Sequence, residues 1–305
     1  MESMNAKSKG FLNGLIAAPF TPLDAKGEVN LDAIDRLADA LVADGVKGAF
    51  VCGTTGESLS FTVAERKAVA ERWVGAAAGR LKIVVHAGHQ CLKDAAELVR
   101  HAAAIGADAV SAMPPSFFRP ETLDDLIDWC AALAAEAPQM PFYYYHIPER
   151  TGVSFRMIDF LERAAERIPN LRGIKYTHTD LMDLAACAAF QDGQFDMLIG
   201  KDEMLLYALM AGARGAIGST YSFAAPIYNR VISALLAGNI QEAQQAQLEA
   251  IAVIRAFSKF GGIASQKAIM KMRGFDCGPV RPPLKDLSPE AYQKLQAEMA
   301  ALGIV

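Results

Sequence analysis

Short apolar runs alternate with long segments of helical periodicity along most of the chain. Two of the helical segments are residues 31–45 and 62–79, in which apolar side chains recur with the spacing of one helix face. The eight apolar runs cover residues 14–20, 48–52, 82–88, 108–114, 141–147, 171–177, 196–200 and 215–220. Strands that alternate with helices in this way predict βαβ units and a parallel sheet.

Eight strands with helices between them predict an α/β fold, a closed (β/α)8 TIM barrel. An open doubly wound sheet is the alternative, although no GxGxxG motif follows the first run. Helical pattern continues after the eighth run, over residues 224–260, 265–272 and 289–302. We therefore expect a single domain over 1–305, with a barrel core at 11–222 and additional C-terminal helices at 223–305 packed on it.

The composition argues against a nucleic acid or a membrane as a binding partner. Hydrophobic residues make up 52% of the 305 positions, which is enough to fill a large core. The net charge of -4 leaves no basic footprint for a nucleic acid. No apolar run reaches the roughly 18 residues of a membrane span, and residues 1–10 lack the apolar stretch of a signal peptide.

The five cysteines stand far apart in the sequence. They are Cys52, Cys91, Cys130, Cys187 and Cys277. An odd number without a CxxC pair argues against a disulfide framework or a zinc knuckle. We therefore expect a cytoplasmic protein with reduced thiols.

Polar residues gather where the predicted strands end, and in a (β/α)8 barrel these ends carry the active site. The residues at these ends are Thr54, Thr55, Tyr145, His146, Lys175, Thr177, Gly200, Asp202, Glu203, Ser219, Thr220 and Tyr221. Separate strands thus bring hydroxyls, a phenol, a lysine and two carboxylates to one rim.

Lys175 is the most informative of these residues, because it closes an apolar run. One interpretation is a lysine that snorkels out of a strand end. The other is a buried amine whose pKa is lowered, so that it attacks a ketone at neutral pH. Tyr145 is the matching candidate for proton transfer, although Phe142 and Tyr143 beside it also fit simple core packing.

Two further motifs have a chemical and a structural interpretation. The GTTGES segment (53–58) precedes a helix, so its amides and its Thr54 and Thr55 hydroxyls can bind an anion, or it can be a tight βα turn. His86 and His89 form an HxxH pattern, but no third ligand or HExxH motif accompanies them. We expect packing or surface histidines and no metal.

Taken together, these motifs resemble the N-acetylneuraminate lyase and dihydrodipicolinate synthase family of class I aldolases, over nearly the whole chain. The motifs that carry the resemblance are GTTGE (53–57), YHIPERTGV (145–153), GIKYT (173–177), KDE (201–203) and GSTYS (218–222). The resemblance implies a homotetramer without cofactor or metal, in which Lys175 forms a Schiff base with pyruvate and Tyr145 relays protons. It implies that Thr54 and Thr55 bind the carboxylate of a 2-keto acid.

Within the family, residues 141–148 and 265–270 look like the vertebrate-type lyases. Such a lyase cleaves N-acetylneuraminate reversibly to N-acetylmannosamine and pyruvate. The implied substrate-binding residues are, besides the two threonines, Thr177, Gly200, Asp202, Glu203 and Ser219. Phe117 stands where the synthases carry a relay tyrosine, which counts against a synthase.

Arg150 departs from the lyase pattern, which has leucine there, and matches the synthases instead. The alternatives are therefore a 4-hydroxy-tetrahydrodipicolinate synthase or another 2-keto-3-deoxy sugar acid aldolase or dehydratase. A non-catalytic regulator that binds a keto acid is the alternative from another class, and the pair of Lys175 and Tyr145 speaks against it.

Overall fold

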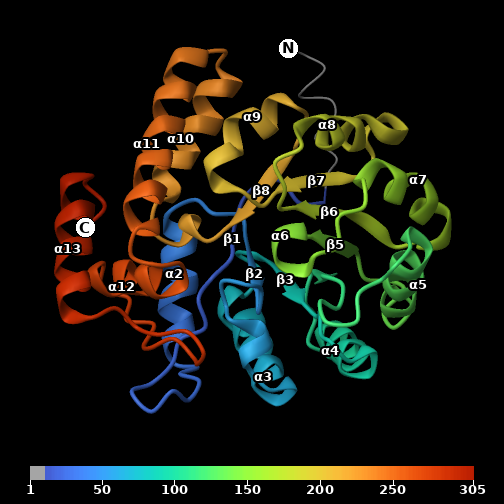
Figure 1. The fold of residues 1–305 in the computed structure, drawn as a ribbon, viewed down its shortest axis with the longest axis horizontal. Coiled ribbons are helices and arrows are strands. Elements are labelled where there is room, and N and C mark those ends of the chain that lie inside the picture. Colours follow the sequence, from blue (N-terminus) through green and yellow to red (C-terminus); the bar gives the residue numbers. More distant parts are fainter. Residues whose placement is uncertain (1–10) are drawn as a thin grey trace. The chain divides into compact units, whose positions relative to one another are not determined.

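The computed structural model describes residues 11–305, and within this range eight parallel strands form a closed barrel in chain order (Figure 1). The strands are β1 (Gly14–Ala17), β2 (Gly48–Val51), β3 (Lys82–His86), β4 (Ala109–Ala112), β5 (Phe142–His146), β6 (Leu171–Tyr176), β7 (Asp196–Ile199) and β8 (Gly215–Gly218). Each strand lies inside one of the predicted apolar runs. The predicted fold class is confirmed, and the open sheet is excluded.

Helices follow the strands and continue beyond the barrel. They are α2 (Ala33–Ala43), η1 (Ser58–Ser60), α3 (Val63–Ala77), α4 (Leu92–Ala104), α5 (Leu123–Ala134), α6 (Pro148–Thr151), α7 (Met157–Arg167), α8 (Leu181–Ala189), η2 (Phe190–Gly193), η3 (Asp202–Met204), α9 (Leu205–Met210), η4 (Thr220–Ser222), α10 (Ala225–Leu236), α11 (Ile240–Ser258), α12 (Ile263–Met272) and α13 (Pro289–Ala301). The η elements are short 3-10 helices. None of the helices between residues 11 and 305 has the length and hydropathy needed to cross a bilayer.

The predicted helical stretch over 224–260 is two helices instead of one. Gly238 has a φ of 75°, in the left-handed region that favours glycine, and it ends the turn after α10. The side chain of Asn239 then accepts a hydrogen bond from the amide of Glu242 at 3.2 Å and caps α11. The expected C-terminal helices are therefore present, with one additional break.

The described chain forms two compact units. The first comprises residues 11–14 and 82–217, in which strands β3 to β7 pair side by side and helices such as α5 and α7 flank them (Figure 1). The second comprises residues 15–81 and 218–305. The single-domain organisation stays a prediction, and the absence of a leader segment concerns residues 1–10, outside the described range.

A buried carboxylate anchors the start of the described chain in the first unit. Asp196, at the first position of β7, is fully buried and accepts hydrogen bonds from the amides of Phe11 and Leu12 at 3.0 and 3.1 Å. It also accepts one from the hydroxyl of Tyr143 at 2.7 Å, and Arg214 lies 3.7 Å away. A buried charge is tolerated only when it is paired and hydrogen-bonded in this way.

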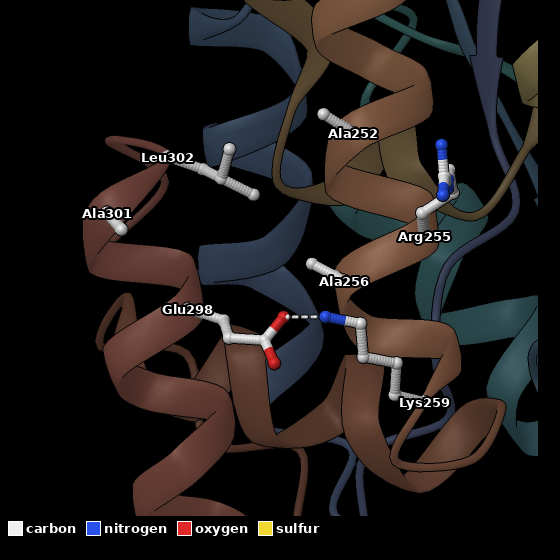
Figure 2. A pocket seen from close by; sticks show the side chains of 7 residues that line it. All are labelled: Ala252, Arg255, Ala256, Lys259, Glu298, Ala301 and Leu302. Atoms are coloured by element: carbon white, nitrogen blue, oxygen red, sulfur yellow. Dashed lines mark hydrogen bonds and ion pairs between the residues drawn. The ribbon is translucent and has the colours of Figure 1, made fainter.

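In the second unit, α10 and α11 run side by side, and α13 packs on α11 and α12 (Figure 1). A cleft of about 390 Å³ is lined by residues of α11 and α13 and of the turns after them, and the ion pair of Lys259 and Glu298 spans it at 2.8 Å (Figure 2). The remaining lining residues are Ala252, Arg255, Ala256, Ala301 and Leu302. With mostly small apolar side chains and an internally paired lysine, this cleft offers no set of groups for catalysis.

Candidate active site

Lys175 and Tyr145 lie beside each other inside the first unit. They are partners in the register of β5 and β6, so their side chains point to the same side of the sheet. The Lys175 Nζ is 4.0 Å from the centre of the Tyr145 ring. Both residues are buried, with exposed fractions of 4% and 2%. The structure thus brings the two predicted catalytic residues into direct contact.

The surroundings of Lys175 tune its amine. Burial lowers the pKa of Lys175 below its ordinary value of 10.5, while the Tyr145 hydroxyl and the Asp202 carboxylate act in the opposite direction. Because burial is the largest of these effects, more of the amine is neutral than in an exposed lysine. A neutral amine is the form that attacks a ketone.

The strand that carries Lys175 is held by a carboxylate from a neighbouring helix. The Tyr176 hydroxyl donates to the Asp183 carboxylate at 3.1 Å and to the Asp180 carbonyl at 2.9 Å. Asp183 also accepts from the amides of Met157 and Ile158, at the start of α7, at 2.9 and 3.0 Å. This network fixes β6 against two helices directly beside the lysine.

Thr177 and Gly200 meet at the ends of β6 and β7. A Cβ on Gly200 would lie 1.9 Å from the Thr177 Oγ1, so the close approach requires glycine. The Thr177 hydroxyl oxygen is buried and has no hydrogen-bond partner within residues 11–305. A buried hydroxyl of this kind is typical of a site that a ligand completes.

Asp202 and Glu203 begin the short helix η3 after β7. Asp202 is 6% exposed, and its carboxylate interacts electrostatically with Lys175, whereas Glu203 is half-buried. Lys201 forms an ion pair with Glu149 on α6, with 2.9 Å between Nζ and Oε1. Sequence reasoning missed this pair, although opposite charges after the fifth and seventh strands were a usable signal.

Arg150 is exposed on α6 and lies next to the paired Glu149. The hydrogen bond from Lys201 is the main cause that lowers the pKa of the Glu149 carboxyl. The positive charge of Arg150 lowers this pKa to a smaller extent. Arg150 therefore has a carboxylate neighbour within the protein.

Histidines of the first unit contact rings, backbone or each other. His86 meets the Tyr145 ring edge-on, with 5.7 Å between ring centres. The His89 Nδ1 accepts from the Cys91 amide at 3.1 Å. Burial and, to a smaller extent, His178 lower the pKa of His146 to about 3. In the described part of the chain, no three His, Cys, Asp or Glu side chains form a group suited to a metal ion.

The GTTGES segment lies in the second unit and is a turn between β2 and η1. The amides of Glu57 and Ser58 donate to the carbonyls of Thr54 and Gly53 at 3.0 and 3.3 Å. Thr54 and Thr55 are half-buried. Cys52, directly before the turn, and Glu57, within it, both have a φ of 57°, a left-handed conformation that is unfavourable for residues with a Cβ.

The end of β8 also belongs to the second unit. Ser219 is half-buried directly after the strand. Thr220 donates from its hydroxyl to the Tyr228 oxygen at 2.7 Å, and the Tyr221 ring meets the Tyr228 ring edge-on at 4.7 Å. Thr220 and Tyr221 thus hold η4 against α10, which leaves Ser219 as the substrate-binding candidate here.

Comparison with known proteins places the chain among relatives. The Dihydrodipicolinate synthetase family model matches residues 11–302. The chain belongs to this family. Family membership agrees with the barrel and the C-terminal helices.

Within the family, the chain is similar to several N-acetylneuraminate lyases. The N-acetylneuraminate lyase of Gallus gallus is 41% identical over 296 residues, which cover 95% of this chain and 96% of the relative. The structure of N-acetylneuraminate lyase (sialic acid aldolase) from Aliivibrio salmonicida is 44% identical, with a TM-score of 0.93 and coverage of 96% and 98%. The N-acetylneuraminate lyase from Proteus mirabilis is 41% identical, with the same TM-score and coverage of 96% and 99%.

Proposed function

We propose that this protein is a carbon–carbon lyase that cleaves N-acetylneuraminate reversibly to N-acetylmannosamine and pyruvate. The observation that carries the proposal is the buried Lys175 amine 4.0 Å from the Tyr145 ring on the adjacent strand. The lyase relatives at about 40% identity over nearly the full chain support it.

The reaction begins with attack of the Lys175 amine on the C2 ketone of the open-chain sugar acid. Loss of water gives an iminium ion, which accepts the electron pair when the C3–C4 bond breaks. Tyr145 donates the proton with which the hydroxyl leaves as water, and the phenolate so formed then takes the proton of the C4 hydroxyl, so that C4 becomes the aldehyde carbon of the released N-acetylmannosamine. Protonation of the remaining enamine and hydrolysis of the iminium release pyruvate and regenerate the amine.

The other site residues bind the two ends of the substrate. We assign the substrate carboxylate to the Thr54 and Thr55 hydroxyls and the adjoining turn. Carboxylates accept hydrogen bonds only, which suits a polyol chain rich in O–H donors. The residues we assign to that chain are Thr177, Gly200, Asp202, Glu203 and Ser219.

No cofactor enters this scheme, because the iminium ion itself is the electron sink. We further propose a cytoplasmic homotetramer whose partner is the small-molecule sugar acid. The five cysteines, all within residues 11–305, form no disulfide with one another, which supports a reducing location. Sedimentation at working concentrations tests the tetramer, and the mass of one chain alone would contradict it.

Arg150 is the observation that favours a second candidate. Its exposed guanidinium on α6 is available to a second carboxylate, which a synthase substrate or a keto sugar diacid carries. The candidate is then a 4-hydroxy-tetrahydrodipicolinate synthase or a related keto sugar acid lyase, with Lys175 in the same role.

A substrate panel separates the two candidates. Pyruvate release is measured from N-acetylneuraminate and from 2-keto-3-deoxy sugar acids, and pyruvate consumption is measured with aspartate semialdehyde. We expect N-acetylneuraminate to give the highest kcat/KM. Preference for a diacid, or condensation with the semialdehyde alone, contradicts the lyase proposal and favours the second candidate. No turnover with any of them favours the non-catalytic regulator.

A further inference from the structure

A buried ion pair holds the GTTGES turn from behind, within the second unit. The Lys267 Nζ, from α12, lies 2.8 Å from the Glu57 Oε1, and the two side chains are 3% and 0% exposed. The same ammonium donates to the Pro279 carbonyl at 2.7 Å. The other carboxylate oxygen of Glu57 accepts from the Arg281 amide at 2.8 Å. Both oxygens of Glu57 are thus engaged by the C-terminal part of the chain.

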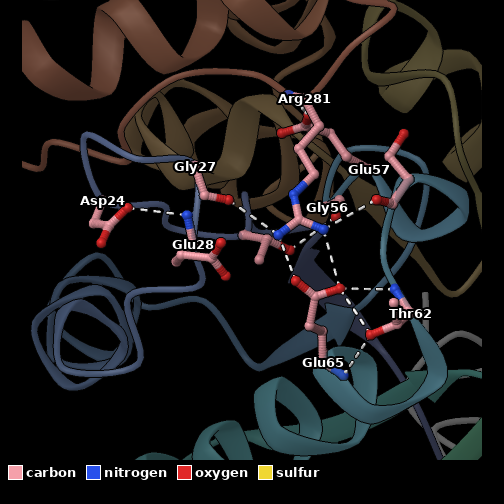
Figure 3. Close-up of polar contacts among 10 residues, drawn as sticks. Asp24, Gly27, Glu28, Gly56, Glu57, Thr62, Glu65 and Arg281 are labelled. Carbon is pink, nitrogen blue, oxygen red and sulfur yellow. Dashed lines mark hydrogen bonds and ion pairs between the residues drawn. The ribbon is translucent and has the colours of Figure 1, made fainter.

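The Arg281 side chain extends the same connection to the helix after the turn (Figure 3). Its guanidinium contacts both carboxylate oxygens of Glu65 and lies 4.0 Å from the centre of the Phe61 ring. It also donates to the carbonyls of Ser60 and Gly27 at 3.1 and 3.0 Å. The C-terminal part of the chain therefore holds the turn itself, through Glu57, and the residues that follow the turn, through Ser60 and Glu65.

Stability alone does not account for this arrangement. A buried ion pair is often no more stabilising than apolar side chains of the same volume. Glu57 moreover holds a left-handed backbone with a φ of 57°, which is unfavourable for any residue with a Cβ. Strained residues that are held by their surroundings cluster at functional sites.

We propose that Glu57 and Lys267 are positioning residues that hold the GTTGES turn in the conformation that binds the substrate carboxylate. The Glu57 amide donates to the Thr54 carbonyl, so a fixed Glu57 fixes the peptide that carries both threonines. This inference rests on the proposed function, which assigns the carboxylate to Thr54 and Thr55. Neither Glu57 nor Lys267 touches the substrate.

The expected signature is a change in binding without a change in chemistry. A turn that must be ordered during binding loses affinity. Lys175 and Tyr145 are held by other strands, so the rate at saturating substrate changes little. A residue that merely supports the fold would instead affect stability and leave the half-saturating substrate concentration in place.

Two variants test this, because Glu57→Gln alone leaves a buried ammonium without a counter-charge. The double variant Glu57→Gln with Lys267→Met removes both charges and keeps an acceptor for the Arg281 amide. The single variant Lys267→Met leaves a carboxylate that can take up a proton instead of remaining charged. Folding is checked by circular dichroism and thermal melting. The matched control is Lys271→Met, which breaks the exposed pair with Asp276 one turn further along α12.

The measurement is the pyruvate concentration that half-saturates borohydride trapping on Lys175, together with kcat for the lyase reaction. In the folded variants we expect half-saturation to rise by about 10–100-fold, with kcat nearly unchanged and the control like the wild type. Unchanged half-saturation in a folded variant overturns the inference. Absence of trapping in the wild type instead overturns the proposed function.

Hydrogen–deuterium exchange of the wild type covers the case in which neither variant folds. Saturating pyruvate should slow exchange in the turn at 53–58 and also in the segment at 278–284 that holds it. Protection of the turn alone would show that the two are not coupled, and would overturn the inference.

Discussion

At the scale of single residues, the proposed chemistry depends on a buried amine and a buried phenol that lie beside each other. Lys175 and Tyr145 are both buried, and His86 meets the tyrosine ring edge-on. Burial favours the neutral amine, and the proposed mechanism assigns the proton transfer to the Tyr145 hydroxyl. The roles of the two residues can be separated by experiment.

Tyr145→Phe removes only the hydroxyl and leaves the ring that packs on His86 and Lys175. We expect kcat to fall by roughly 10²–10⁴-fold, which is the usual contribution of a general acid–base group. Thermal melting should be close to that of the wild type, because the ring remains. Steady-state kinetics with N-acetylneuraminate provides the measurement, and an unchanged kcat would show that Tyr145 only packs.

Variants of Glu203 and Arg150 test whether the site binds a substrate tail rich in hydroxyls or one with a second carboxylate. Glu203→Gln removes a carboxylate that we assign to the hydroxyl-rich tail of the substrate, so we expect KM for N-acetylneuraminate to rise by about 10–100-fold. Pyruvate trapping on Lys175 should be unaffected. Arg150→Leu, on exposed α6, should leave cleavage nearly intact. If Arg150→Leu instead abolishes activity and the best substrate carries a second carboxylate, the lyase assignment fails.

At the scale of elements, the predictable features are those with a local cause. The apolar run at 171–177 predicts β6 and its terminal lysine, and Thr62 caps α3 through a local capping box with Glu65. Asp196 had no such signal, because its partners Phe11 and Tyr143 are distant in sequence. Lys267 could not be predicted for the same reason. Its sequence neighbours indicate only an amphipathic helix, and its partner Glu57 is distant in sequence.

Asp196 gives a stability prediction for the start of the barrel. Asp196→Asn keeps the volume but leaves buried amides without their anion and removes the ion pair with Arg214. We expect the free energy of unfolding to fall by about 2–3 kcal/mol, measured by urea denaturation. Pyruvate trapping on Lys175 in the remaining folded protein should continue. An unchanged unfolding midpoint would show that the network is not stabilising.

The pair of Glu65 and Arg281 gives a pH prediction for the contact between α3 and the C-terminal segment. The hydrogen bond from Arg281 lowers the pKa of Glu65 from 4.5 to about 2. The carboxylate therefore contributes stability above pH 4.5, and this contribution is lost as the pH falls toward about 2. Its upper limit is roughly 3 kcal/mol.

Glu65→Gln is the variant that isolates this contribution. Unfolding free energies of the wild type and Glu65→Gln should differ most at neutral pH and converge below the folded-state pKa. Glu290→Gln, which breaks the exposed pair with Lys294 on α13, serves as the control with little effect. A difference that stays constant between pH 7 and pH 2 would contradict the assignment.

At the scale of the whole molecule, the periodicity of the chain predicts the barrel and the C-terminal helices. Eight apolar runs in βαβ order leave few other ways to bury both faces of each strand. Substrate identity does not follow from the same pattern. Barrels of this kind host many reactions, because a few strand-end residues such as Arg150 and Glu203 decide what binds.

Reduction with borohydride in the presence of pyruvate tests the Schiff-base chemistry most directly. After digestion, mass spectrometry should find the adduct on the Lys175 peptide alone. The half-buried Lys201 and the buried Lys267 serve as internal controls, because both are already paired with carboxylates. Labelling at another lysine, or no labelling in a folded protein, would contradict the assignment of Lys175 as the nucleophile.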